Sequence, residues 1–359
     1  MTPSAPPARR GSSLTSSLGL AEKLFSSATE RRFLAAIDAG LDRIEQGLLA
    51  EMAFGDDLAD VTSRYLFSAG GKRIRPALAV LVSQLGDGAT DAVVAAAQAV
   101  EITHLASLYH DDVMDEATMR RGVPSAQAKW GNNVAILTGD LLFARASTIV
   151  ADLGEAAIRL QAQTFERLCL GQLHETIGPR EGDDPIDHYL DVLADKTGSL
   201  ISMAAKIGVM FSGASHEYLG PVASFGEKVG VAFQIADDVI DLSPQPEETG
   251  KRAGTDLLAG VATLPLLYLR REAQTDVDSA ALLAEIEANV RAAVAGGEVS
   301  EADLADTVAQ LREHDVTART HAEARRWAQA AVDALAPLPS GPVKKALTRF
   351  ADRVVERSA

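Results

Sequence analysis

The chain has 359 residues, of which 47% are apolar and 23% charged, and its formal net charge is −16. These values are typical of a soluble protein with a sizeable core. The negative charge argues against binding to nucleic acid or to an anionic membrane surface. The single cysteine, Cys169, excludes an intramolecular disulfide framework and indicates a reducing compartment, which we take to be the cytoplasm.

The first twenty residues are rich in serine, proline and glycine and contain no cleavable apolar core. We interpret residues 1–21 as a disordered tail and residues 22–359 as one helical domain. No uninterrupted apolar run reaches the ~18 residues that a membrane-spanning helix needs. We therefore expect no transmembrane segment.

Past the tail, apolar residues recur at steps of three and four, which is the period of an amphipathic helix. The helical segments that we expect are 24–49, 58–67, 93–115, 134–153, 156–174, 187–193, 200–211, 222–241, 264–271, 282–294 and 322–335. Glycine and proline clusters separate them, and no alternating run is long enough for a strand. The pattern predicts an all-α, single-domain bundle of about ten or more helices. The acidic stretch 275–320 shows no recognisable chemistry.

Two segments repeat one acidic pattern. Residues 111–115 read DDVMD, residues 237–241 read DDVID, and each ends an apolar helical stretch. Helical residues three and four apart share a face, so Asp111 and Asp115 project together, in line with His104. Crowded carboxylates at a helix C-terminus are unfavourable, and a magnesium ion would relieve that cost while taking further ligands from substrate phosphates. A solvated acidic helix end is the alternative for one cluster, but two such clusters argue against it.

Basic groups lie between and beside the acidic segments. They occur at 70–76 (GGKRIRP), 120–122 (RRG), 196–198 (KTG) and 250–252 (GKR). Arginine's planar fork suits phosphate oxygens, and lysine supplies a mobile point charge. Each group alone would be an ordinary soluble surface. Interleaved with the acidic segments, they predict a cavity for two diphosphates, one bridged by metal and one held by basic side chains.

Together these segments resemble the trans-prenyltransferase family, the all-trans polyprenyl diphosphate synthases, over roughly residues 30–350. The two Asp-Asp-x-x-Asp motifs, in order and at the expected separation, are highly specific. The resemblance implies an isoprenoid-synthase fold around a central cavity and a magnesium-dependent 1'-4 trans condensation of isopentenyl diphosphate with an allylic prenyl diphosphate. It further implies a homodimer, with transient membrane contact for product release. Similarity to bacterial long-chain members suggests a long product for a quinone side chain, as in menaquinone biosynthesis.

The resemblance also implies roles for individual residues. The residues expected to bind isopentenyl diphosphate are Lys72, Arg75, His104 and Arg121. Those expected to contact the allylic diphosphate are Arg120, Lys196 and Lys251. The expected magnesium ligands are Asp111, Asp115 and Asp237, supported by Asp112, Asp238 and Asp241. The residues expected to line the cavity near the developing allylic cation are Thr197 and Gln234.

One position departs from the family pattern. The family usually carries a lysine before the x-Thr-Leu-Pro segment, and here residue 261 is valine. Either a diphosphate contact is missing, or Arg252 replaces it. The departure leaves the reaction itself unchanged.

Chain length should depend on residues just before the first aspartate. In the family, the positions four and five residues earlier form the floor of the product tunnel, and here they are Ser107 and Ala106, both small. Small residues predict a long product, although Ala106 points away from the carboxylate stripe by ideal helix spacing. Tyr109 is bulky and would stop growth earlier if it turned inward.

Other functions fit the residues less well. A shorter-chain farnesyl or geranylgeranyl diphosphate synthase is the main alternative. A terpene cyclase on the same scaffold needs only one diphosphate site, so Lys72 and Arg75 argue against it. A silent subunit of a heteromeric synthase would be expected to lose aspartates that are intact here. A calcium-binding helical protein would need a glycine-centred loop that these acidic groups lack.

Overall fold

The computed structural model describes residues 27–243, 254, 257, 260–294 and 300–356. The expected disordered tail at 1–21 therefore lies outside the described residues, as do Lys251 and Arg252. Nearly every regular element in the described part is a helix, and the only strands there form one two-residue antiparallel hairpin. The predicted all-α fold is confirmed.

The elements follow one another along the chain with short connections. They are α2 (Ala28–Glu51), α3 (Asp57–Ser68), α4 (Ile74–Ser83), α5 (Asp91–Met114), β1 (Met119–Arg120), β2 (Val123–Pro124), α6 (Ala126–Trp130), α7 (Asn132–Asp152), α8 (Glu155–Ile177), α9 (Pro185–Leu193), the π-helical turn η2 (Ala194–Gly198), α10 (Ser199–Met210), the 3₁₀ turn η3 (His216–Tyr218), α11 (Leu219–Ile240), α14 (Leu264–Glu272), α15 (Val277–Val294), α16 (Glu301–Glu313), α17 (Asp315–Ala334) and α18 (Pro342–Glu356).

Several helices begin at residues that satisfy their first backbone N–H groups. Ser27 and Glu30 form a capping box at the start of α2, and Asp56 accepts hydrogen bonds from two backbone amides at the start of α3. Asp184 does the same for α9, with Pro185 in the first turn. Such caps are worth about 1 kcal/mol each. They fix where each helix enters the bundle.

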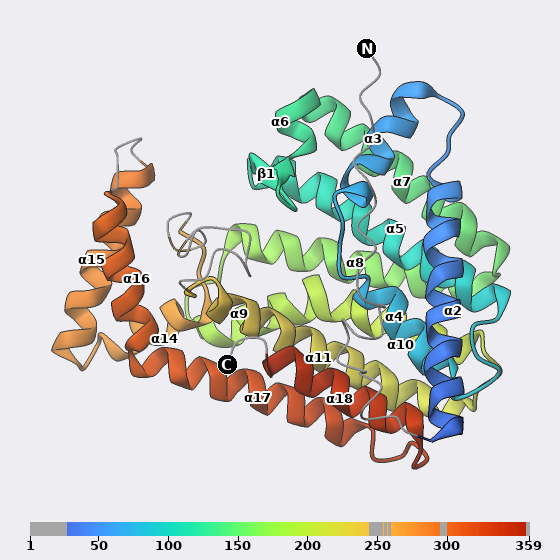
Figure 1. Ribbon diagram of the computed structural model, residues 1–359. Coiled ribbons are helices and arrows are strands. Elements are labelled where there is room, and N and C mark those ends of the chain that lie inside the picture. Colours follow the sequence, from blue (N-terminus) through green and yellow to red (C-terminus); the bar gives the residue numbers. More distant parts are fainter. Residues whose placement is uncertain (1–26, 244–253, 255–256, 258–259, 295–299, 357–359) are drawn as a thin grey trace.

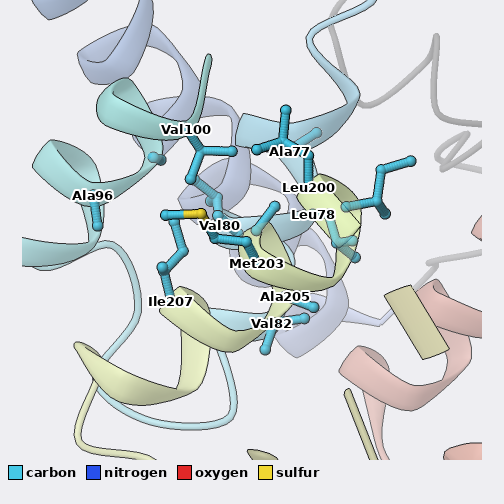
Figure 2. Packing of buried hydrophobic residues seen from close by; sticks show 14 of the residues in the cluster. Ala77, Leu78, Val80, Val82, Ala96, Val100, Leu200, Met203, Ala205 and Ile207 are labelled. Atoms are coloured by element: carbon cyan, nitrogen blue, oxygen red, sulfur yellow. The ribbon is translucent and has the colours of Figure 1, made fainter. Parts of the chain in front are cut away.

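The core is built around α4, α5 and α10. From Pro76 to Ser83 every residue of α4 is buried, and Figure 2 shows side chains of this helix packed against Val100 of α5 and Met203 of α10. Gly208 of α10 allows a close approach, because a Cβ there would lie 2.6 Å from the Ala79 carbonyl oxygen of α4. Interiors packed this tightly transmit small displacements, so α4 holds its first turn rigidly.

The two acidic motifs end two helices in the middle of the bundle. Figure 1 shows α5, α8, α10 and α11 centrally, with α2, α17 and α18 outside them and α15 and α16 projecting to one side. The second acidic motif ends α11, as the first ends α5. A second apolar cluster, formed mainly by α11, α14, α15, α16 and α17, supports the C-terminal end of α11.

Two helices, α5 and α7, are long and apolar enough to span a membrane by length and composition. The apolar window of α5 is 72% buried inside the protein, as expected of a core helix, whereas that of α7 is only 39% buried. The face of α7 that remains exposed carries Ile136, Leu137 and Leu141. An apolar patch of this kind on a folded chain is typical of an interaction surface.

Candidate active site

The loop before α4 gathers arginines. Gly70 and Gly71 have φ values of 110° and 145°, which glycine adopts easily. A Cβ on Gly71 would lie 2.6 Å from Nη1 of Arg73 and 3.0 Å from Nη2 of Arg121. Only glycine at this position lets the two guanidinium groups come so close to the backbone.

Arg73 is the structural member of this group. It is 6% exposed, its Nε lies 2.9 Å from Oε2 of Glu45, and its Nη1 lies 3.5 Å from Oε1 of Glu101. It also donates to the carbonyl oxygens of Phe67 and Gly70. These contacts occupy its donors, so Arg73 supports the loop and leaves substrate binding to its neighbours.

Arg75 and Arg121 are the cations held ready for an anion. Burial lowers the pKa of Arg75 to about 10, with Glu101 opposing that effect. Its buried Nε has no hydrogen-bond partner within the described part of the chain. Nη1 of Arg121 donates to the carbonyl oxygens of Leu66, at 2.8 Å, and Gly70. Burial also lowers the pKa of Arg121.

His104 lies on α5 beside these arginines. Burial, followed by the charges of Arg75 and Arg121, holds the pKa of its imidazole well below its usual value. The ring is therefore neutral near pH 7 and can donate one N–H without adding to the local positive charge. Lys72 completes the basic group, with its Nζ 5.4 Å from the centroid of the Phe233 ring on α11. The structure thus brings Lys72, Arg75, His104 and Arg121 into one region.

Glu101 is a site residue that the sequence reasoning missed. It is 2% exposed, pairs with Arg73, and is the main charge that opposes the lowered pKa values of Arg75 and Arg121. Its Oε2 atom is buried without a hydrogen-bond partner among the described residues. A lone carboxylate inside the apolar run that precedes His104 was the available signal.

The three aspartates of the first motif occupy different environments. Asp112 is fully buried and accepts a 2.6 Å hydrogen bond from Nε of Arg120, while its other carboxylate oxygen has no partner among the described residues. Burial raises the pKa of Asp111 to about 6, with Lys196 opposing and Asp115 adding to the effect. Asp115 is exposed at the end of α5. A cation near Asp111 would therefore be bound favourably.

Lys196 reaches this motif from the π-helical turn η2. Its Nζ lies 2.5 Å from Oε2 of Glu175 on α8, and its charge acts on Asp111. Thr197 follows it in the same turn and is half-buried. Glu175 also was not identified from the sequence, because nothing in its neighbourhood distinguishes it from other exposed acidic residues of α8.

In the second motif, Asp238 is tied to the surrounding helices. Its Oδ2 accepts from the Tyr189 hydroxyl at 2.5 Å and from the Leu264 backbone amide at 2.8 Å. Asp241 is 8% exposed, whereas Asp237 and Gln234 are half-buried along the same helix face. These environments agree with a supporting part for Asp238 and a more accessible one for Asp237.

A metal ion would need ligands beyond those that the protein preassembles. Within the described ranges, no three carboxylate, imidazole or thiol groups converge closely enough to hold an ion. The donors available are carboxylate oxygens, including the unpartnered oxygen of Asp112, which suit a hard divalent cation. Magnesium fits this arrangement because it commonly completes its shell with waters and substrate phosphates.

The three chain-length candidates face different ways. The Tyr109 side chain is fully buried, and its hydroxyl donates to the Thr62 carbonyl and accepts from the Leu66 amide, so the ring is fixed against α3. Ser107 is half-buried on the face of Asp111, with its hydroxyl bonded to the His104 carbonyl. Ala106 is 1% exposed. Val261, the departure from the family pattern, is 44% exposed shortly before α14.

The fold and this pairing of acidic and basic groups define a synthase of prenyl diphosphates. The family model for polyprenyl synthetase matches residues 57–296. The chain is 45% identical over 326 residues to a nonaprenyl diphosphate synthase of Mycobacterium tuberculosis, covering 90% of this chain and 94% of that one. It belongs to the polyprenyl synthetase family and is a prenyltransferase.

Solved structures agree with this assignment. A polyprenyl synthase of Caulobacter crescentus, complexed with calcium and isoprenyl diphosphate, superimposes with a TM-score of 0.80 and 29% identity over 92% of this chain and 98% of that one. A geranylgeranyl pyrophosphate synthase of Corynebacterium glutamicum, also complexed with calcium and isoprenyl diphosphate, gives 0.76 and 39% over 93% and 98%. The reaction class is therefore shared among relatives with different product lengths.

Proposed function

We propose that the chain extends an allylic prenyl diphosphate by successive 1'-4 trans condensations with isopentenyl diphosphate, with magnesium as cofactor. The observation that carries this proposal is the division of charge along α5. Asp111 meets Lys196 at one end of the helix, whereas His104, Arg75 and Arg121 gather seven residues earlier. Seven helical residues span roughly 10 Å, which leaves room for two diphosphates with the reacting carbons between them.

The allylic diphosphate is assigned to the Asp111 end. Its carbon–oxygen bond must ionise, and Lys196 and Arg120 stabilise the negative charge that grows on the leaving diphosphate. Magnesium bound by Asp111, Asp115 and Asp237 would neutralise further phosphate charge. Thr197 and Gln234 line the space near the allylic cation. Lys251 is assigned to the same diphosphate by family resemblance.

Isopentenyl diphosphate is assigned to the basic end. Lys72, Arg75 and Arg121 would hold its diphosphate, and neutral His104 would donate one hydrogen bond to it. Its double bond then attacks the allylic carbon, and loss of a proton yields the extended product. The described side chains near this end are cations and a neutral imidazole of low pKa, which are poor bases. We assign the proton to the departing diphosphate.

We further propose a long product, destined for a quinone side chain such as that of menaquinone. Ser107 and Ala106 are small, and the Tyr109 ring is fixed against α3 by two hydrogen bonds. The nonaprenyl relative supports this length, whereas the geranylgeranyl relative supports a shorter one. Chromatography of labelled products from each allylic primer in turn tests the proposal. Products that end at fifteen or twenty carbons would refute the long-chain assignment.

We also propose a homodimer in the cytoplasm, with transient membrane contact when a long product leaves. The dimer proposal is supported by the exposed apolar face of α7, formed by Ile136, Leu137 and Leu141. Covering this face would remove apolar side chains from water. Light scattering of the wild type and of Leu137→Glu tests it. A monomeric wild type, or a dimeric Leu137→Glu variant, would contradict the assignment of this face.

A further inference from the structure

One stripe of α8 contacts the turn that carries Lys196. Arg167, Gly171 and Glu175 are spaced four residues apart and therefore share a helix face. Each meets η2 differently: Arg167 binds Asp195, Gly171 packs against the Lys196 backbone, and Glu175 pairs with the Lys196 side chain. The three contacts hold backbone and side chain of one turn against one helix.

Arg167 joins three separate elements. Its Nε lies 2.7 Å from Oδ1 of Asp195 in η2, and its Nη1 lies 2.6 Å from Oε2 of Glu227 in α11. Its Nη2 donates to the carbonyl oxygen of Ala194 at 3.4 Å. A planar guanidinium can make these bonds simultaneously, whereas a lysine could replace only part of them.

The turn itself is a local departure from the α-helix. Residues 185–210 run from α9 through η2 into α10, and the π-helical part contains one extra residue per turn. Removing the extra residue would rotate the side chains on one side of the turn by roughly 100°, the angle between successive helical residues. Lys196 would then point away from Asp111. A device that holds the π-turn therefore sets the direction of this lysine.

Small residues allow the turn to sit between its two supports. A Cβ on Gly171 would lie 2.8 Å from the backbone nitrogen of Lys196, and a Cβ on Gly230 would lie 2.8 Å from Cα of Gly198. Because α8 and α11 approach η2 so closely, a bond between them across η2 is short enough for one side chain. Arg167 makes that bond through Asp195 and Glu227.

We infer that Arg167 is a positioning residue for prenyl transfer, which locks η2 so that Lys196 faces the allylic diphosphate. The inference rests on the proposed assignment of Lys196 to that diphosphate. The side chains of Arg167, Asp195 and Glu227 are 40%, 28% and 37% exposed, and ion pairs so exposed add little to global stability. The effect of losing Arg167 should therefore appear in kinetics before it appears in folding.

The test compares Arg167→Gln with Lys196→Gln, the double variant, and Arg159→Gln. Arg159 is the matched control, since it lies on α8 and pairs only with exposed Glu155 in its own helix, at 2.7 Å. Michaelis constants are measured for the allylic primer and for isopentenyl diphosphate, and thermal melting checks the fold. Arg167→Lys tests partial rescue.

Arg167→Gln should raise the Michaelis constant for the primer about tenfold, the loss expected for one charge-assisted hydrogen bond. The constant for isopentenyl diphosphate should stay within about twofold of the control, well under one such bond. Arg167→Lys should recover part of the loss. In the double variant, Arg167→Gln should add little to the effect of Lys196→Gln, because both act through the same contact.

Three results would overturn the inference: Arg167→Gln that matches Arg159→Gln, effects on primer and isopentenyl diphosphate that are equal, or effects of Arg167 and Lys196 that add fully. If Lys196→Gln leaves the primer constant unchanged, the assignment of Lys196 fails first. If only Arg167→Gln is silent, the inference alone fails. Should Arg167→Gln not fold, Asp195→Asn removes one arm of the same contact and must show the same selective rise.

Discussion

The charge of Glu101 should hold the three arginines of the isopentenyl diphosphate site together when substrate is absent. Glu101 is 2% exposed, and its Oε1 lies 3.5 Å from Nη1 of Arg73. At an effective dielectric constant of 20, a pair at that distance is worth about 5 kcal/mol. Part of this is offset by desolvation of the carboxylate, so we expect Glu101→Gln to destabilise the protein by about 3 kcal/mol, as for other buried pairs that lose one partner.

The informative measurement is how far inorganic pyrophosphate restores that loss. With Glu101 neutralised, Arg73, Arg75 and Arg121 repel one another, and a bound anion supplies the missing negative charge. Thermal melting should therefore show a lower midpoint for Glu101→Gln, by roughly 5 °C or more. Saturating pyrophosphate should raise the midpoint of this variant more than that of the wild type.

Glu45→Gln is the matched control for this experiment. Glu45 binds the same guanidinium, at 2.9 Å, but its side chain is 41% exposed, so its removal should cost less and should change the pyrophosphate effect little. An equal pyrophosphate shift in Glu101→Gln and wild type would refute the reasoning, as would a Glu101→Gln variant as stable as wild type.

Four further predictions concern the acidic motifs, the basic site and the tunnel. Asp111→Asn and Asp237→Asn should each lower turnover by orders of magnitude at saturating magnesium without unfolding, and near-normal turnover in steady-state assays would contradict the two-motif metal site. With chelator present, the folded-state pKa of Asp111, raised from 3.8 to about 6, means that stability falls as pH rises from 3.8 to 6. Asp111→Asn should therefore stabilise the metal-free protein by up to about 3 kcal/mol at pH 7 and by nothing below pH ~4, as pH-dependent melting would show. Arg121→Ala should raise the Michaelis constant for isopentenyl diphosphate more than that for the primer; equal increases would mean that the two arginines do not divide the substrates. Ser107→Phe or Ala106→Phe should shorten the product in chromatography with little effect on the first condensation, and full-length product at normal rates would place the tunnel elsewhere.

The helices that could be predicted from sequence are those with one wet and one dry face. The segments expected at 134–153 and 222–241 match α7 and α11 within three residues at each end. Helix α4 was missed because it is buried all round from Pro76 to Ser83 and shows no helical period. Helix α18 was missed although it has a clear apolar face with Leu347 and Phe350, so that omission was avoidable.

The composition of the site could be predicted, but the division of labour within it could not. Two identical motifs gave the same expectation for Asp112 and Asp238. In the structure, Asp112 binds Arg120, eight residues away, whereas Asp238 binds Tyr189 and the amide of Leu264, 49 and 26 residues away. Such partners depend on how distant helices pack, and no local pattern specifies them. The same holds for Arg167 and its contacts with η2.

The β1–β2 hairpin sets a limit on how this enzyme can vary in length. Arg121 and Gly122 form its turn with φ values of 54° and 76°, as a two-residue turn with matching twist requires, while Arg120 lies in the strand before it. Arginine in this left-handed conformation costs about 1 kcal/mol relative to glycine. Arg120 binds Asp112, and Arg121 binds the carbonyls beside α4. Insertion of a single residue here would turn each side chain to the opposite side. Length variation among homologues, and any engineered insertion, should therefore avoid residues 119–124 and accumulate in surface connections instead.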